Sequence, residues 1–429
     1  MTAAPERLRL RLPRALLDPR LAALPVGADD GLVAIELEQR QGRITALRPL
    51  TGGCGDPLPL ALTPLVEPHA HLDKCFTAAA FPNPAGTIAG AMAANRRESE
   101  QRTAEQVLER AELALEQAWR HGLRAIRSHI DSAGPAALPS WEALLQLRRR
   151  WAGRVDLQLV ALVPLAHWSS AEGEQLGRWV ADRGGLLGGV LGPPYGHLRS
   201  DRDALGALLG LAERLGAGVD LHVDEAAEHP GRGVALLADV VAERSTGVPV
   251  TCSHAASMAL LGPRRLELLA ERLATAGIAV VALPLTNLWL LGRRPERTPK
   301  LRVQAPIRRL QRAGVLVAVG ADNVQDPWFP GGDFDPVELL RLAPLTSHLW
   351  PAQRQGLAPF SSAPARLLGL EWDGLVREGG PADLVLLAAG SWTELLARTP
   401  RRLVLRDGRW LTPPALQQAS ALLPAVSMV

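Results

Sequence analysis

The chain has few lysines, few cysteines and few aromatic residues. Lys74 and Lys300 are the only lysines, three cysteines lie far apart, and aromatic residues make up 4% of 429 positions. The odd, scattered cysteines argue against a disulfide framework or a Cys-rich zinc site. Sparse aromatics, with no Lys/Arg run between them, argue against a nucleic-acid surface. No apolar run of about 18 residues is present, so we expect neither an export signal nor a membrane span, and a cytoplasmic location.

The overall composition is that of a globular protein. Hydrophobic residues make up 47% of the chain, charged residues 21%, and the net charge is +3. These proportions are typical of soluble domains. The length allows one large α/β barrel with an attached domain, or two to three ordinary domains.

The two ends of the chain carry short, strand-like segments broken by turn residues. These segments cover residues 8–12, 31–38, 43–48, 382–387 and 403–410. Alternating apolar residues and intervening glycines indicate strands and hairpins. We therefore expect one small β-sandwich domain built from residues 1–60 and 372–429. The alternative is two unrelated tails.

The middle of the chain alternates strand-like and helix-like segments. Short apolar runs occur at 62–66, 125–129, 157–163, 188–191, 219–223, 248–252, 279–285 and 315–319. Amphipathic stretches between them, clearest at 104–120 and 204–215, indicate helices. This pattern predicts an α/β fold with a distorted (β/α)8 barrel over residues 61–371. The competing doubly wound sheet lacks its Gly-rich phosphate loop. The long connection at 75–95 is expected to be a functional lid.

Two histidines close the first apolar run of the predicted barrel. His69 and His71 are two residues apart, so in an extended chain their side chains point the same way. By themselves they could equally be solvated or core histidines. Ionisable residues at other strand ends change this balance: His129, Asp131, His222, Asp224, Glu225, His254 and Asp322. Barrel chemistry takes place at these ends. Three imidazoles with one carboxylate suit a divalent ion such as Zn²⁺ or Fe²⁺, with an activated water as a further ligand.

Six stretches of the sequence, most of which contain these residues, resemble those of a known family. The similar stretches, in order, are 66–73, 127–131, 222–225, 250–254, 284–287 and 322–330. In sequence and spacing they resemble the amidohydrolase superfamily, and more closely its cytosine deaminase-like subgroup, with isocytosine deaminase and N-alkylammelide hydrolase relatives. The resemblance covers roughly residues 58–345, and both β-rich ends match the family's small sandwich domain.

The resemblance implies a role for each matching residue. It makes His69, His71, His222 and Asp322 the metal ligands, Glu225 the proton shuttle, His254 a hydrogen-bond donor to the reacting centre, and Trp328 a wall of the ring pocket. Asp322 would also take a proton from the attacking water. Binuclear members use a carboxylated lysine at the end of the fourth strand. Residues 188–194 contain none, which implies a single metal ion.

Two departures set this chain apart from cytosine deaminase itself. That enzyme has a ring-reading glutamine where this chain has Val163-Pro164, and an aspartate where this chain has Asn323. Lys74 resembles relatives acting on isocytosine- or triazine-type rings. Lys74 would hold an anionic or carbonyl-rich ring, or else be a solvated loop lysine. His129 and Asp131 would be either substrate contacts or a structural pair.

The expected function is therefore hydrolytic deamination of a small nitrogen heterocycle. A metal-activated water would attack the amino-bearing ring carbon and release ammonia. The alternatives are hydrolysis of another cyclic amidine or an N-alkylated triazine, and a catalytically inactive binding protein on the same scaffold. The expected partner is a small heterocyclic substrate, without nucleic acid or membrane, and the sequence leaves a homo-oligomer open.

Overall fold

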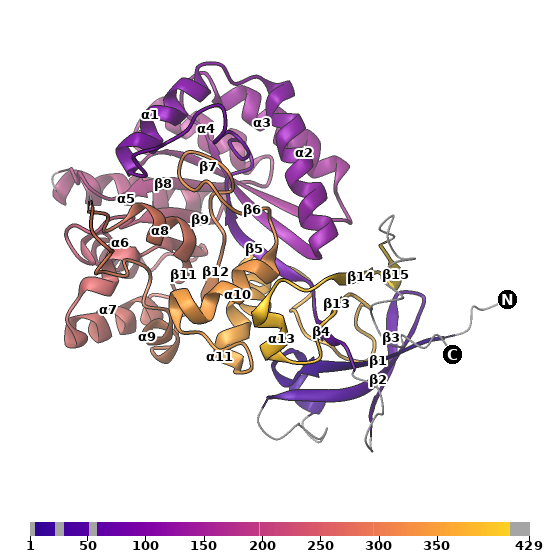
Figure 1. The fold of residues 1–429 in the computed structure, drawn as a ribbon. Coiled ribbons are helices and arrows are strands. Elements are labelled where there is room, and N and C mark those ends of the chain that lie inside the picture. Colours follow the sequence, from indigo (N-terminus) through magenta and orange to yellow (C-terminus); the bar gives the residue numbers. More distant parts are fainter. Residues whose placement is uncertain (1–4, 22–29, 51–57, 197, 295, 412–429) are drawn as a thin grey trace. The chain divides into compact units, whose positions relative to one another are not determined.

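The computed structural model describes residues 5–21, 30–50, 58–196, 198–294 and 296–411 (Figure 1). Two compact units make up the chain. The smaller joins Met1–Val66, Ala118–Arg124 and Asp335–Val429, and the larger joins Glu67–Gln117 and Ala125–Phe334. The domain boundaries near residues 60 and 372 stay a prediction.

Strands from both ends of the chain form one mixed sheet of seven strands in the smaller unit, as expected. Its order is β15-β14-β13-β4-β1-β2-β3. The strands are β1 (Glu6–Pro13), β2 (Leu32–Arg40), β3 (Arg43–Pro49), β4 (Leu60–Leu62), β13 (Leu384–Leu387), β14 (Arg402–Arg406) and β15 (Arg409–Trp410). Alternate residues such as Leu8, Leu10 and Leu12 are buried in its core. The period-2 pattern in the sequence therefore marks the buried face.

Two tight hairpins set the register of this sheet. Gln41 and Gly42 connect β2 to β3, and Asp407 and Gly408 connect β14 to β15. All four residues have positive φ, between 51° and 76°. Two-residue loops with positive φ at both positions match the right-handed twist of the strands they join.

Eight strands in the larger part of the chain form the barrel that the sequence predicts. Their order is β12-β11-β10-β9-β8-β7-β6-β5, and neighbouring strands run parallel. They are β5 (Leu65–Ala70), β6 (Leu123–Asp131), β7 (Asp156–Pro164), β8 (Leu186–Leu191), β9 (Val219–Val223), β10 (Val250–His254), β11 (Ala279–Ala282) and β12 (Val317–Val319). Close approach of the two neighbouring strands requires a glycine at position 188 in β8. A Cβ atom there would lie 2.8 Å from the carbonyl oxygens of Ala161 and Asp220 on the neighbouring strands.

Helices connect the barrel strands along the chain, and further helices follow the last of these strands (Figure 1). The α-helices are α1 (Ile88–Ser99), α2 (Ala104–His121), α3 (Ala137–Arg150), α4 (Ala171–Ala181), α5 (Leu198–Leu215), α6 (Arg232–Arg244), α7 (Pro263–Thr275), α8 (Pro284–Leu290), α9 (Ile307–Arg312), α10 (Pro336–Ser347), α11 (Arg354–Leu357), α12 (Ser362–Leu367) and α13 (Trp392–Ala397). Short 3-10 turns cover Arg14–Leu16, Pro19–Leu21, Leu165–Ser169, Ala256–Leu260 and Ala358–Phe360.

Two expected elements differ from the structure. The strand predicted at 279–285 ends at Ala282, because Pro284 begins α8 and proline is favoured in a first helical turn. The connection predicted at 75–95 is partly helical, since the Thr87 hydroxyl caps α1 by accepting from the Gly90 N–H. The remainder is tied to the segment after β12: Phe76 N–H donates to the Val324 carbonyl oxygen at 3.1 Å.

The barrel is nearly closed by a seam between β5 and the segment after β12. Ala70 pairs with Asp322 in one parallel bridge. The buried Glu67 carboxyl accepts the N–H groups of His69 at 3.0 Å and Ala321 at 2.9 Å. Gly320 leaves room for this contact, because a Cβ atom there would lie 2.5 Å from Glu67 Oε1. The seam thus holds His69 and Asp322 side by side.

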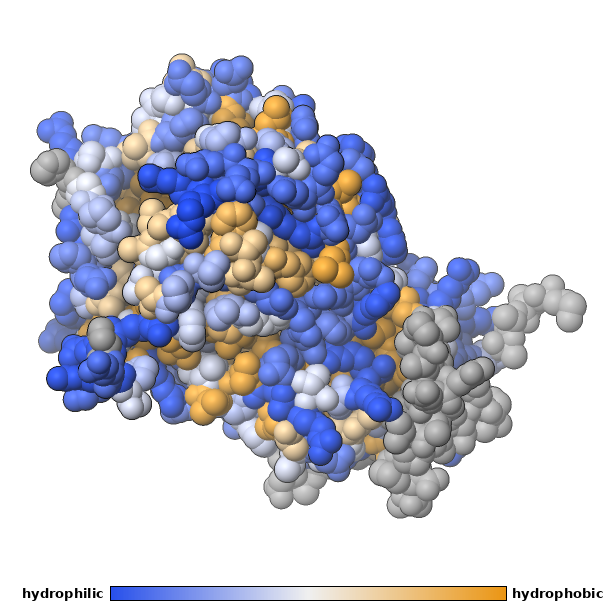
Figure 2. Space-filling model, turned by 45° about the horizontal axis from the view of Figure 1, so that its top comes forward, coloured by the Kyte–Doolittle hydropathy of each residue, from blue (hydrophilic) through white to orange (hydrophobic). Residues whose placement is uncertain are grey.

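None of the described helices is long and apolar enough to cross a membrane. On the face shown in Figure 2, hydrophilic residues predominate and apolar residues occur in smaller groups. Cys75 and Cys252 are buried free thiols, and Cys54 lies outside the described residues.

Candidate metal centre

Three histidines and one aspartate converge at the carboxyl ends of three barrel strands. They are His69 at the end of β5, His71 just after it, His222 in β9 and Asp322 just after β12. The Nε2 atoms of His71 and His222 are 3.3 Å apart. Asp322 Oδ1 lies 3.3 Å from His71 Nε2 and 3.5 Å from His69 Nε2. The distant segments therefore meet as the strand-end pattern predicts.

The atoms at this point lack other partners. His69 Nε2 and both carboxylate oxygens of Asp322 are buried with no hydrogen-bond partner among the described residues. An unsatisfied buried polar atom costs about 1–3 kcal/mol, so such a group calls for a ligand. Burial, with neighbouring charges, lowers the pKa of His69, His71 and His222 well below the usual value. Neutral imidazole is the form that binds a metal, and this donor set fits a divalent ion.

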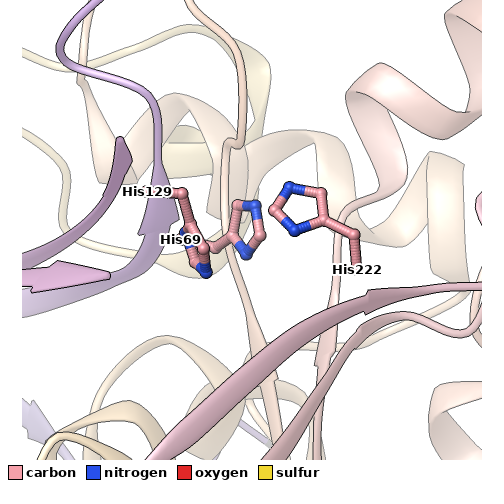
Figure 3. A group of neighbouring side chains, drawn as sticks. All are labelled: His69, His129 and His222. Carbon is pink, nitrogen blue, oxygen red and sulfur yellow. The ribbon is translucent and has the colours of Figure 1, made fainter. Parts of the chain in front are cut away.

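His129 lies within the same cluster. Nitrogen atoms of His69, His129 and His222 all lie within 4.8 Å of one another, and Figure 3 shows the three rings gathered together. The rings of His69 and His129 stack with centroids 3.8 Å apart. His129 Nε2 lies 3.4 Å from Asp220 Oδ1. The structure therefore places His129 beside the metal-binding candidates.

A hydrogen-bonded chain sets the tautomer of His69. The Ser253 hydroxyl donates to Asp220 Oδ1 at 2.8 Å, so it can only accept from His69 Nδ1, 2.9 Å away. His69 Nε2 is then an unprotonated lone pair facing the cluster. Arg127 contacts the other Asp220 oxygen at 2.8 Å. Burial raises the pKa of Asp220, but His129 and Arg127 outweigh it and lower that pKa overall.

This supporting chain is not among the residues that the strand-end pattern predicts. Asp220 and Arg127 lie two residues before His222 and His129, on the same inward-facing rows of β9 and β6. Because side chains two residues apart on a strand point to the same face, the positions of His222 and His129 indicate these two residues. Ser253 gives no such signal, because it precedes His254 by one residue. Groups that orient metal-binding histidines in this way tune their affinity for the ion.

Glu225 and His254 lie next to the cluster. His254 Nε2 lies 3.7 Å from Glu225 Oε2, and both residues group with Asp322. The Asn287 amide lies 3.0 Å from His254 Nδ1, so as donor it leaves the proton of His254 on Nε2. Burial raises the pKa of Glu225, opposed by the charge of Lys74. A carboxyl with a raised pKa is suited to giving and taking protons near neutral pH. His254 and Asp322 also have positive φ, 69° and 68°, an uncommon conformation that clusters at functional sites.

Lys74 is buried rather than solvated. It is 3% exposed, and its Nζ atom lies 2.8 Å from Asp131 Oδ1 and 4.8 Å from the centre of the Trp328 ring. The solvated-loop alternative is therefore wrong. Asp131 also contacts the buried Arg102 at 3.3 Å, so it anchors Lys74 within a network of charges.

Asn323 and Trp328 belong to one folded loop after β12. The Asn323 amide donates to Asp326 Oδ2 at 2.7 Å, and the Asp326 carboxylate accepts the Trp328 N–H at 2.8 Å. Asn323 is thus already engaged within the loop. The Lys74 ammonium lies over the Trp328 ring, and the role of Trp328 as a wall of the ring pocket stays a prediction.

Comparison with known proteins identifies the family. Residues 101–411 match the model of the amidohydrolase family. The chain is an amidohydrolase. This match confirms the family resemblance seen in the sequence. It also confirms that the protein belongs to a class of enzymes that act on carbon–nitrogen bonds.

Several characterised proteins are similar to this amidohydrolase over most of its length. It is 37% identical to the pterin deaminase of Rhizobium rhizogenes over 345 residues, 80% of this chain and 78% of that protein. It is 25% identical to the N-isopropylammelide isopropyl amidohydrolase of a Pseudomonas species over 358 residues, 80% and 84% of the two chains. The solved structure of 5-methylcytosine deaminase from Klebsiella pneumoniae, liganded with 5-fluorocytosine, superposes with a TM-score of 0.79 at 27% identity, covering 95% and 97%.

Proposed function

We propose that this amidohydrolase is a hydrolytic deaminase of a small nitrogen heterocycle. One observation carries the proposal: the unpartnered His69 Nε2 and Asp322 oxygens lie together at the carboxyl ends of the barrel strands, and Asp322 also groups with Glu225 and His254. The 37% identity to a pterin deaminase supports the same reaction class. A catalytically inactive binding protein would have no need of a proton-transfer group beside the donor cluster.

Four residues would hold one divalent ion, Zn²⁺ or Fe²⁺. They are His69, His71, His222 and Asp322, whose donor atoms converge. When bound, such an ion is a Lewis acid that makes water nucleophilic near neutral pH. No lysine lies in β8 (Leu186–Leu191), and Lys74 is engaged with Asp131. Among the described residues, no lysine is therefore placed at the end of β8 to bridge a second ion.

The remaining residues would manage protons. The water oxygen forms a bond to the amino-bearing ring carbon while Asp322 accepts a water proton. Glu225 delivers a proton to the adjacent ring nitrogen, and His254 Nε2–H donates to the charge that develops on oxygen. A proton then passes to the amino group, the carbon–nitrogen bond breaks, and ammonia leaves an oxo-substituted ring.

A pterin is the first candidate substrate. Its 2-amino-4-oxopyrimidine ring presents a carbonyl and an amino-bearing carbon, and the buried Lys74 ammonium is suited to the carbonyl oxygen. N-alkylated triazines are the second candidate class, because two similar proteins, at 25% and 27% identity, are N-isopropylammelide hydrolases.

We expect one divalent ion per chain in protein purified without added metal. The reason is that the candidate ligand atoms of His69, His71, His222 and Asp322 lie close together and no lysine is placed to bridge a second ion. Elemental analysis of the purified chain measures the ratio, and His222→Ala should lower it. A ratio near two, with both ions required for activity, would contradict the single-ion site.

We expect pterin and isocytosine to be deaminated and cytosine to be a poor substrate. Val163-Pro164 offers no polar side chain where cytosine deaminase has its glutamine, and Asn323 is bonded to Asp326. Each ring donor or acceptor left unpaired in the site costs about 1–3 kcal/mol. Ammonia release from pterin, isocytosine, cytosine, creatinine and triazines tests the proposal.

Each outcome of this screen has a clear meaning. A kcat/KM for cytosine of about 10⁴ M⁻¹s⁻¹ or more, inside the ordinary enzymatic range, would refute the argument from the pocket. Release of isopropylamine from N-isopropylammelide, without ammonia from the other rings, would favour the second class. No turnover of any compound by metal-loaded protein would refute the proposed function.

A further inference from the structure

His129 is a fully buried histidine near the carboxyl end of β6, and the reaction proposed above gives it no part. Neither of its ring nitrogens has a hydrogen-bond partner among the described residues. Buried polar groups are normally hydrogen-bonded, so an exception calls for an explanation. Three roles are open to this side chain: a further metal ligand, a contact to the substrate, or a support for the rings of the ligands.

The His129 ring packs against the rings of two candidate ligands (Figure 3). It stacks on His69, with ring centroids 3.8 Å apart and ring planes inclined by 26°. Its edge contact with His222 has centroids 4.9 Å apart and planes inclined by 89°. Offset stacking and edge-to-face packing are the arrangements that aromatic rings favour. A single buried ring therefore contacts two of the residues that would hold the ion.

The stack with His69 argues against a shared metal ion. The lone pair of an imidazole nitrogen lies in the ring plane, so a bound ion lies near that plane, about 2.0–2.1 Å from the nitrogen. Two stacked rings inclined by only 26° have no common point that close to a nitrogen of each. His129 therefore cannot join His69 as a ligand of one ion, although their nitrogens and those of His222 lie within 4.8 Å of one another.

Asp220 links His129 to the chain that orients His69. His129 Nε2 lies 3.4 Å from Asp220 Oδ1, the oxygen that also accepts the Ser253 hydroxyl at 2.8 Å. Ser253 in turn lies 2.9 Å from His69 Nδ1. The ring of His69 is thus held at its edge by the Ser253 hydroxyl and on its face by the His129 ring.

We propose that His129 is a positioning residue that retains the metal ion without binding it. Its ring would keep those of His69 and His222 in the orientation in which their Nε2 atoms face the ion. Groups that orient metal-binding histidines change metal affinity by about 10–100-fold. The inference rests on the metal site of the proposed function and adds no step to the reaction. It sets aside the substrate contact that the sequence left open for this histidine.

Release of Zn²⁺ from the metal-loaded protein to a chromogenic chelator tests the proposal without any substrate. His129→Ala removes the ring and should release Zn²⁺ about 10–100-fold faster than the native chain. His129→Phe restores a flat ring that has no nitrogen, so release should return to within about five-fold of the native rate. His229→Ala, at an exposed histidine outside the cluster, is the matched control and should not change release.

Steady-state kinetics at saturating Zn²⁺ separate support of the ligands from contact with the substrate. Loss of a substrate contact raises KM, whereas loss of a support for the ion does not once the ion is restored. We therefore expect His129→Ala to keep KM for pterin within about two-fold of the native value under these conditions.

Each outcome supports or overturns the inference. Equally fast release of Zn²⁺ from His129→Ala and His129→Phe would make a ring nitrogen a ligand and overturn it. Native retention of Zn²⁺ by His129→Ala would also overturn it, whether or not KM for pterin rises. A native chain that binds no Zn²⁺ would refute the proposed function and the inference together. The expected pattern of Zn²⁺ release without turnover of pterin would support the inference and refute only the choice of pterin as substrate.

Discussion

Glu225→Gln is expected to bind metal normally and to lose nearly all turnover. The amide keeps the size of the side chain but cannot take up and release a proton. Glu225 lies 3.7 Å from His254 and beside Asp322, where a proton must move between water and ring. General acid–base groups contribute about 10²–10⁴-fold, so kcat should fall by that factor. Ammonia release and elemental analysis on the same preparation measure both properties.

Glu228→Gln is the matched control for this variant. Glu228 lies three residues further along the same loop and is exposed, so its substitution should leave kcat and metal content unchanged. Near-normal turnover by Glu225→Gln would show that another group moves the proton. Loss of the metal by that variant would instead make Glu225 a ligand, against the proposed ligand set.

Arg102→Met is expected to lower the free energy of unfolding by about 3–5 kcal/mol, the usual cost of removing one partner from a buried ion pair. The Arg102 side chain is fully buried. Its guanidinium contacts Asp73 at 2.9 Å, Glu98 at 2.5 Å and Asp131 at 3.3 Å. Methionine fills similar space but leaves these carboxylates with less compensating charge. Urea unfolding of the metal-loaded protein measures the change.

Arg178→Met supplies the comparison. Arg178 is also paired with a glutamate, Glu174, at 2.7 Å, but its side chain is 66% exposed. Exposed pairs contribute about 0–1 kcal/mol because water and salt screen them. Equal losses from the two arginine variants would mean that burial of the Arg102 network does not matter for stability. A lower urea midpoint for Arg102→Met with kcat unchanged would show that the network stabilises the fold without positioning Lys74.

The barrel could be predicted because its signals are local. Apolar runs such as 219–223 and amphipathic stretches such as 104–120 are each complete within a few turns or strand residues. The ends of these predicted strands and helices are less accurate where a proline or a helix-capping residue intervenes. Pro284 ended a strand early, and Thr87 began a helix inside the connection predicted as a loop.

The strand-end pattern of the sequence grouped a larger set of ionisable residues at one site, and the family resemblance selected His69, His71, His222 and Asp322 among them as metal ligands. Parallel strands of a barrel place their carboxyl ends on one face, so ionisable residues at several strand ends must be neighbours. This expectation requires only the order of the strands and the two-residue repeat of side-chain direction along each strand. It cannot say which atoms of neighbouring side chains touch, because that depends on the register between strands.

Tertiary structure alone decided the surroundings of that site. It placed His129 against His69, set the tautomer of His69 through Ser253, and buried Lys74 against Asp131. These contacts join residues 57 or more positions apart in the chain, and no local pattern specifies them. They arise because closing the barrel takes charged side chains out of water, and each must then meet a partner or a ligand.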